Sequence, residues 1–170
     1  VFAIGLVDDI WGLAARFKLL AEVVAATAVA LSGVSIDQLS LTSGGTLRFG
    51  WLSIPLTILW IVGITNAVNL IDGLDGLASG ISLITCTVIA AVAIYMQRPV
   101  MAVLMLALIG SLIGFLFFNF NPARIFLGDC GSLFLGFTLA SSSVITSHKT
   151  STLVAIAMPV LALGVPIFDT

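Results

Sequence analysis

The chain contains 170 residues, of which 60% are hydrophobic and 8% are charged, and its formal net charge is −2. Its mean hydropathy of +1.26 lies far above the values of soluble globular domains. A net charge this small, without basic patches, excludes a nucleic-acid-binding protein. The composition predicts a polytopic membrane protein in contact with the lipid bilayer.

Hydrophobic runs long enough to cross a bilayer follow one another along the chain. A helix that rises about 1.5 Å per residue needs about 20 residues to cross about 30 Å of hydrocarbon. We therefore expect an all-α fold with about six to seven transmembrane helices, at residues 1–7, 17–32, 52–68, 77–96, 99–118, 132–147 and 152–168. Because the first run begins in mid-helix and the chain stops just after the last, residues 1–170 are expected to form a single domain that is incomplete at both ends.

The segment between the second and third expected helices differs from the rest. Residues 35–50 are polar, contain β-branched side chains and are interrupted by Gly44 and Gly45. Such a pattern around a glycine turn is typical of a β-hairpin. We expect a short hairpin outside the bilayer, on its extracytoplasmic side.

Acidic residues collect on one side of the membrane when the loops are counted through the expected helices. This side receives six of the eight acidic residues, namely Asp8, Asp9, Asp72, Asp75, Asp129 and Asp169. Asp37 falls on the opposite side, and Glu22 lies within a helix, where the four-residue spacing predicts a pair with Lys18. The basic residues divide evenly between the sides, so the positive-inside rule does not orient the chain.

Crowded carboxylates at a membrane boundary repel one another unless a cation or hydrogen-bond donors compensate their charge. Mg²⁺ prefers oxygen ligands and is typically held by one or two carboxylates together with substrate phosphates. Mn²⁺ is the alternative ion. A competing interpretation is that Asp9, Asp72 and Asp129 only cap the helices that begin beside them. Capping alone does not explain why the acids gather on one side.

The segment 66–78 has the sharpest pattern in the chain. Polar residues recur there at every third position, and two glycines let the backbone approach a ligand closely; these residues are Asn66, Asn69, Asp72, Asp75, Gly73 and Gly76. The segment resembles the polyprenyl-phosphate N-acetylhexosamine-1-phosphate transferase family (glycosyltransferase family 4). That family's pattern Asn-x-x-Asn-x-x-Asp-Gly-x-Asp-Gly-Leu is matched at every specified position.

Further motifs of this family occur in the expected order. Asp8 and Asp9 resemble its first aspartate pair, Lys18 its following lysine, and residues 118–132 its third motif. One departure is the sequence after the pair, which lacks a polar residue that the family often carries there. The family's histidine-rich motif is also missing, and His148 falls on the side opposite the acids.

The resemblance implies a single transmembrane catalytic domain that transfers a sugar-1-phosphate from a UDP-sugar to a polyprenyl phosphate and releases UMP. Residues 166–170 and the form of the 66–78 motif are similar to the branch that uses UDP-N-acetylglucosamine and undecaprenyl phosphate in the first membrane step of cell-envelope polysaccharide synthesis. Phospho-N-acetylmuramoyl-pentapeptide transferase is the alternative. The implied location is the cell membrane, with several spans and the active site on the cytoplasmic face, and a homodimer is compatible with it.

The resemblance also implies roles for individual residues. Asp8, Asp9 and Asp129 are the expected catalytic residues, with Asp129 as first choice for a Mg²⁺ ligand and Asp9 as second. The first pair would orient or deprotonate the lipid phosphate, and Lys18 would attract it as a point charge. The expected substrate-binding residues are Lys18, Asn66, Asn69, Asp72, Asp75 and Asn119.

Two other classes of membrane protein compete with an enzyme. A secondary transporter also gathers acids near glycine-broken helices, but it predicts charges near span centres and repeated halves. This chain places its acids at span ends and has no internal repeat. A structural scaffold leaves the uneven distribution of aspartates unexplained.

Overall fold

The computed structural model describes residues 1–40 and 46–147, and these residues are mostly helical. The helices are α1 (Phe2–Trp11), α2 (Ala15–Leu31), the short 3₁₀ helix η1 (Gly50–Leu52), α3 (Ser53–Ile71), α4 (Leu77–Tyr95), α5 (Pro99–Asn119) and α6 (Gly128–Ser147). Each lies where a hydrophobic run predicts a helix, but three bounds differ: α1 extends to residue 11 instead of 7, α3 to residue 71 instead of 68, and α6 begins at residue 128 instead of 132. Asp8 and Asp9 therefore lie in the last turns of α1, not in a loop. The helix expected at 152–168 lies outside the described residues.

Three of these helices are long and apolar enough to cross a membrane by length and composition. These segments are Gly50–Ile71, Leu77–Tyr95 and Pro99–Asn119. Helix α1, with 10 residues, is shorter than a complete span requires, and α2, with 17 residues, is at the lower limit of span length. Large apolar side chains are exposed along α5, where Val100 and Phe117 are 83% and 82% exposed. A surface of this kind fits contact with lipid.

Two short strands, β1 (Gln38–Ser40) and β2 (Thr46–Arg48), lie between α2 and η1. They pair antiparallel, with Gln38 opposite Arg48 and Leu39 opposite Leu47. Residues 41–45, which include the glycine pair of the expected hairpin turn, lie outside the described residues.

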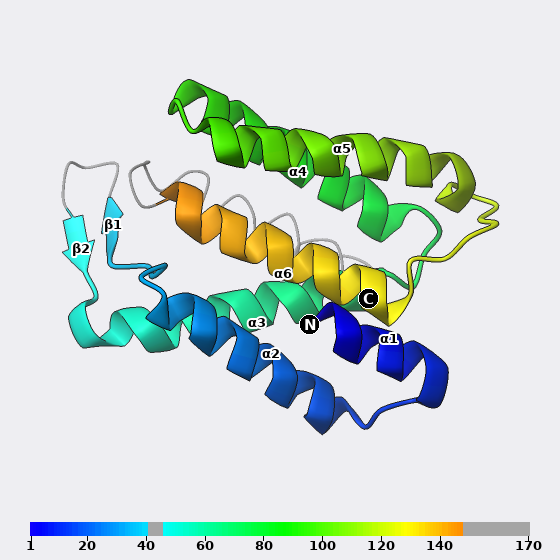
Figure 1. Cartoon of the computed structure of the whole chain (residues 1–170), viewed down its shortest axis with the longest axis horizontal. Helices are drawn as coiled ribbons and strands as arrows, with labels where there is room; N and C mark the ends of the chain where they lie inside the picture. Colours follow the sequence, from blue (N-terminus) through cyan, green and yellow to red (C-terminus); the bar gives the residue numbers. More distant parts are fainter. Residues whose placement is uncertain (41–45, 148–170) are drawn as a thin grey trace.

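Helix α6 lies at the centre of the bundle and packs against α1, α3 and α4, while α5 packs on α4 and α2 packs on α3 (Figure 1). Buried side chains such as Ile61, Ile89 and Met105 form the core. Glycine allows two close contacts of α6. A Cβ on Gly136 would lie 2.8 Å from the Cα of Thr65 in α3, and one on Gly5 would lie 2.5 Å from the Cα of Cys130. Small residues at such crossings are typical of helices packed in membranes.

The connections alternate between the two ends of the bundle. The α1–α2, α3–α4 and α5–α6 loops lie together at one end, whereas the strands and the α4–α5 turn lie at the other (Figure 1). Asp8, Asp9, Asp72, Asp75 and Asp129 lie in two of these loops or in the helix turns beside them, so they share one end of the molecule, which we call the acidic end. The count of expected helices also places these residues together.

Candidate active site

The C-terminal end of α1 and the first turn of α6 bring two carboxylates to one lysine. The ammonium nitrogen of Lys18 lies 2.8 Å from Oδ2 of Asp8 and 2.5 Å from Oδ2 of Asp129. The side chains are 20%, 13% and 29% exposed for Lys18, Asp8 and Asp129, respectively. The three groups come from three different helices, so tertiary packing alone joins them.

Asp9 caps the N-terminus of α6 from a neighbouring helix. Its Oδ1 accepts the backbone N–H of Asp129 at 2.8 Å, and its Oδ2 accepts that of Cys130 at 3.0 Å. A carboxylate suits this position because the first N–H groups of a helix lack partners within the helix and carry partial positive charge. Gly128 makes room for it: its φ is +67°, and a Cβ there would lie 2.9 Å from Oδ2 of Asp9. Asp9 therefore fixes the backbone position of Asp129.

The hydrogen bonds at this end keep the first aspartate pair ionised. Lys18 donates to Asp8, and together with Asp129 and the N–H of Leu13 it lowers the pKa of Asp8 from 3.8 to about 2. Burial raises the pKa of Asp9, but the N–H groups of Cys130 and Asp129 outweigh burial and bring this pKa below its ordinary value. Both carboxylates are therefore charged at neutral pH.

A second group of predicted residues surrounds a small cavity at the same end. The cavity has a volume of about 70 Å³ and is lined by Asp72, Gly73, Leu74, Asp75, Asn119, Phe126 and Leu127. Hydrogen bonds hold its walls together. Oδ2 of Asp75 accepts the N–H of Ala123 at 3.0 Å. Asn119 accepts from the Ser79 hydroxyl at 2.6 Å and donates to the carbonyl of Ile125 at 2.9 Å.

Asp72 links the two groups electrostatically. Burial raises its pKa from 3.8 to about 6, and the negative charges of Asp129 and Asp9 add to the shift. This is the repulsion among neighbouring carboxylates that the sequence predicts for a crowded acidic end. A positive charge brought near these three residues would favour the ionised form of Asp72.

Asn66 and Asn69, which the sequence assigns to substrate binding, join helices in this structure. Asn66 donates to Glu22 of α2 and, at 2.9 Å, to the carbonyl of Val62. Asn69 accepts from the Ser132 hydroxyl of α6 at 2.5 Å. Their role in substrate binding stays a prediction.

The predicted pair between Glu22 and Lys18 is wrong. Glu22 is buried, with 2% exposure, and its carboxylate accepts from Asn66, whereas the ammonium of Lys18 reaches Asp8 and Asp129. The four-residue spacing makes the two side chains neighbours on α2, but packing against α1, α3 and α6 supplies both with partners on other helices.

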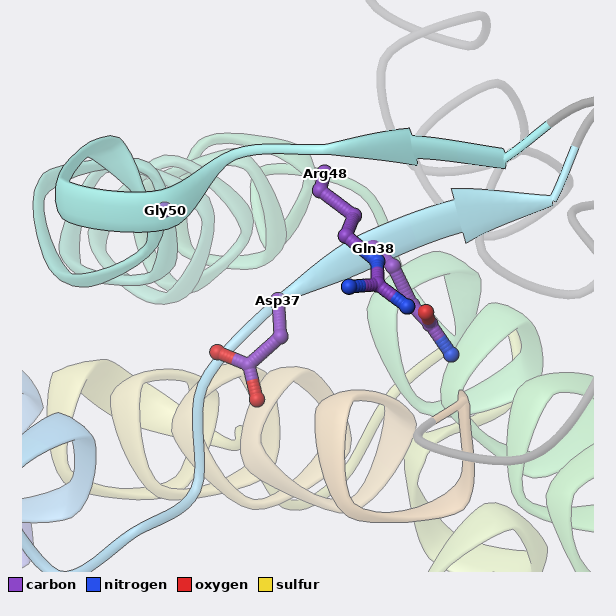
Figure 2. A pocket seen from close by; sticks show the side chains of 4 residues that line it. All are labelled: Asp37, Gln38, Arg48 and Gly50. Carbon is purple, nitrogen blue, oxygen red and sulfur yellow. The ribbon is translucent and has the colours of Figure 1, made fainter.

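A larger cavity of about 430 Å³ lies at the opposite end, beside the two strands, and is lined by Asp37, Gln38, Arg48 and Gly50. The side chains of Asp37, Gln38 and Arg48 extend to the same side of the strands (Figure 2). Oδ1 of Asp37 accepts from the hydroxyls of Ser35 and Ser53, each at 2.7 Å. This cavity holds one carboxylate and none of the predicted site residues, so its size does not make it the better candidate.

The acidic end suits a divalent cation only in combination with substrate. Within residues 1–40 and 46–147, no group of three or more His, Cys, Asp and Glu side chains is arranged to hold a metal ion. Asp8 and Asp129 nevertheless converge on one point, which the Lys18 ammonium marks. Two carboxylates of this kind match the protein share of a Mg²⁺ site whose remaining ligands are water and phosphate oxygens.

Sequence reasoning missed three participants at this end. Ser79 and Ser132 hold Asn119 and Asn69 in place, and Phe126 lines the small cavity with its side chain 72% exposed. Both Phe126 and Ser132 lie within the segment 118–132 that resembles a family motif, which is the signal that could have identified them.

Comparison with known proteins bears on these observations. The model of glycosyl transferase family 4 matches residues 1–147. A probable undecaprenyl-phosphate N-acetylglucosaminyl 1-phosphate transferase of Bacillus subtilis (strain 168) is 46% identical over 172 residues, covering 100% of this chain and 48% of that protein. A phospho-N-acetylmuramoyl-pentapeptide-transferase of Listeria innocua is 44% identical over 61% of this chain and 32% of that protein. One of Limosilactobacillus reuteri is 46% identical over 65% of this chain and 35% of that protein.

The chain thus spans about half, or less, of the length of these curated relatives. The family match nevertheless covers every described helix, the acidic end and the small cavity. The chain belongs to glycosyl transferase family 4.

Proposed function

We propose that this chain is part of a membrane enzyme that transfers N-acetylglucosamine-1-phosphate from UDP-N-acetylglucosamine to undecaprenyl phosphate and releases UMP. The observation that carries the proposal is the convergence of Asp8, Lys18 and Asp129 at the end of the bundle that also holds the cavity lined by Asp72 and Asn119. The printed name of the Bacillus relative, which matches the chain over its whole length, supports this choice of sugar and lipid.

The proposed reaction is a phosphoryl transfer. A phosphate oxygen of the lipid forms a bond to the β-phosphorus of the UDP-sugar, and the bond from that phosphorus to the bridging oxygen breaks, so that UMP leaves with the electron pair. Such reactions depend chiefly on positioning and charge neutralisation. A phosphate with a second pKa of about 6 is already largely dianionic at neutral pH. With a pKa of about 2, Asp8 is a poor proton acceptor, and we assign it an orienting and electrostatic role instead.

We propose Asp129 as the principal protein ligand of Mg²⁺ or Mn²⁺. The bound ion would neutralise charge on the pyrophosphate and on the leaving UMP. Asp9 is the second ligand expected from the sequence. Both oxygens of Asp9 already accept N–H groups of α6, so Asp9 holds Asp129 in place. Asp8 is therefore the better second ligand beside Asp129.

We assign the nucleotide to the small cavity. Asp72, Asp75 and Asn119 offer hydrogen-bond partners there, and the exposed ring of Phe126 offers a surface on which a base can stack. With a volume of about 70 Å³, the cavity can admit part of a nucleotide only, so the remainder would lie outside it. Asn66 and Asn69 would support this site through α2 and α6.

The proposed placement in the membrane follows from the alternation of loops in Figure 1. The acidic end would face the cytoplasm, and the strand pair would lie on the extracytoplasmic side. The remaining helices, including α2 and α6, would complete a multi-pass domain of six to seven spans with the segment 152–168. A homodimer remains compatible with this arrangement.

Phospho-N-acetylmuramoyl-pentapeptide transfer is the second candidate function, because enzymes of that name match 61% to 65% of the chain. A secondary transporter is less well supported, since the described aspartates of the acidic end lie at helix ends and in loops instead of near span centres.

A membrane assay of the full-length protein tests the proposal. Membranes with undecaprenyl phosphate and radiolabelled UDP-N-acetylglucosamine should form a labelled lipid and release UMP, and a chelator should stop both. UDP-N-acetylmuramoyl-pentapeptide is the matched second substrate. Turnover of that nucleotide alone would transfer the assignment to the peptidoglycan reaction, and turnover of neither would overturn both.

A further inference from the structure

The Lys18 ammonium occupies the point at which the carboxylates of Asp8 and Asp129 converge. Its contacts of 2.8 and 2.5 Å are hydrogen-bonded ion pairs, and the three side chains are at most 29% exposed. A charge held this way in partly buried surroundings interacts with its partners more strongly than one on an open surface. Lys18 is therefore a counter-ion that Asp8 and Asp129 share.

We propose that Lys18 is a displaceable counter-ion that competes with the divalent cation for Asp8 and Asp129. The inference rests on the proposed function, since it takes Asp129 as a ligand of that cation. It differs from the role expected for Lys18 from the sequence, which is attraction of the lipid phosphate.

A shared oxygen and charge repulsion both favour this competition. Mg²⁺ binds carboxylate oxygens at about 2.0–2.1 Å. An ion at that distance from Oδ2 of Asp129 would share the oxygen with the Lys18 ammonium, which lies 2.5 Å away. Two cations that share this oxygen repel each other, so metal binding there favours release of Lys18 from Asp129. The displaced ammonium would then be free to meet an anionic phosphate.

The neighbourhood allows such a movement. Asp129 keeps its position without Lys18, because the Asp9 carboxylate anchors the N–H groups of Asp129 and Cys130. Asp8 also accepts the N–H of Leu13, so its orientation does not depend on the lysine alone. The Asp8 carboxylate is thus held by a backbone N–H, and the backbone that carries Asp129 is held by Asp9, while the four-carbon stem of Lys18 can rotate.

Binding of Mn²⁺ without substrate tests the inference in the purified full-length protein. Titration calorimetry and the electron paramagnetic resonance signal of free Mn²⁺ should both report that Lys18→Met binds Mn²⁺ about tenfold or more tightly than the parent. Lys18→Arg should bind it several-fold less tightly, because a guanidinium can hold a carboxylate through two hydrogen bonds. Arg16→Met is the matched control: it removes an exposed cation of the same helix that stacks on Phe17, and it should leave the affinity unchanged.

The double variant Lys18→Met, Asp129→Asn shows whether the tighter Mn²⁺ binding of Lys18→Met arises between Asp8 and Asp129. This variant should bind Mn²⁺ no more tightly than the parent. Equal or weaker Mn²⁺ binding by Lys18→Met, or a gain that survives loss of Asp129, would overturn the inference while leaving a metal-dependent reaction intact. If neither the parent nor any of these variants binds Mn²⁺ although all of them are folded, the metal assignment and this inference are both overturned.

Discussion

Asp9 and Asp129 are joined through the backbone: Oδ1 of Asp9 accepts the N–H of Asp129 at 2.8 Å, and its Oδ2 accepts the next N–H at 3.0 Å. The first aspartate pair thereby sets the start of α6 and the position of the acidic residue in its first turn. Two motifs that lie about 120 residues apart in the chain act as one structural unit.

Asp9→Ala should remove both hydrogen bonds and loosen the first turn of α6. Loss of a helix cap costs about 0.5–2 kcal/mol of stability. Backbone hydrogen exchange at Asp129 and Cys130 should accelerate, and activity should fall because Asp129 is no longer fixed. Unchanged exchange at these two positions, together with lost activity, would instead assign Asp9 a direct role with the metal or substrate.

Gly128→Ala tests the same junction without removing a charged group. The φ of +67° and a Cβ position 2.9 Å from Oδ2 of Asp9 leave no room for a methyl group, so we expect lower stability and lower activity. Gly80→Ala is the control, since a Cβ there meets nothing within 4 Å and Gly80 lies inside α4. Equal thermal stability of the two variants would contradict the proposed crowding at residue 128.

The helices could be predicted from the sequence because a long apolar run is a local feature of the chain that needs no tertiary partner to be recognised. The start of α6 could not, since it depends on Asp9 in another helix and on the positive φ of Gly128. The same limit explains the error at Glu22. Spacing along α2 makes Lys18 its neighbour, but only the packed bundle brings Asn66 to one residue and Asp129 to the other. The resemblance to family motifs identified the residues of the acidic end. Which of them form ion pairs, cap a helix or line the cavity depends on tertiary packing and could not be predicted from the sequence.

The pair between Glu22 and Asn66 should be sensitive to loss of one partner. Asn66→Leu leaves the carboxylate of Glu22 buried without this donor, which costs about 1–3 kcal/mol. Replacing both residues, as Glu22→Leu and Asn66→Leu, should restore much of the loss, because two apolar groups can pack together. Thermal unfolding in detergent measures both variants. A double variant less stable than Asn66→Leu alone would show that Glu22 has another essential partner.

Asp72 predicts a pH dependence of stability. Its pKa is raised to about 6 by burial and by the charges of Asp129 and Asp9, so the folded state binds this proton more tightly than the unfolded chain does. The stabilisation is present below about pH 4 and is lost as the pH rises through about 6. Asp72→Asn should therefore raise the melting temperature relative to the parent at pH 8, and the difference should shrink toward pH 4. A chelator is needed because a bound cation would stabilise the ionised form. A difference independent of pH would contradict the raised pKa.

Asp129→Asn should lower turnover by at least about 100-fold, as expected when a charge that stabilises the transition state is lost. The amide keeps the size of the side chain, and the N–H that Asp9 accepts belongs to the backbone, so folding should be preserved. Asp37→Asn, at the opposite end of the bundle, is the matched control and should keep near-parental activity. Full activity of Asp129→Asn at any Mg²⁺ concentration would remove Asp129 from the mechanism.

The proposed orientation predicts which loops a membrane-impermeant thiol reagent reaches in intact cells. A background in which Cys86, Cys130 and every cysteine of any flanking sequence are replaced by alanine allows single cysteines to be introduced at Trp51 and Ala123. Trp51 is 83% exposed beside the strand pair, and Ala123 lies in the α5–α6 loop of the acidic end. The cysteine at 51 should react in intact cells, whereas the cysteine at 123 should react only after permeabilisation. Because α3, α4 and α5 separate the two positions, an odd number of crossings requires opposite sides. Reaction of both cysteines in intact cells, with a known cytoplasmic cysteine protected, would contradict this topology and the cytoplasmic placement of the acidic end.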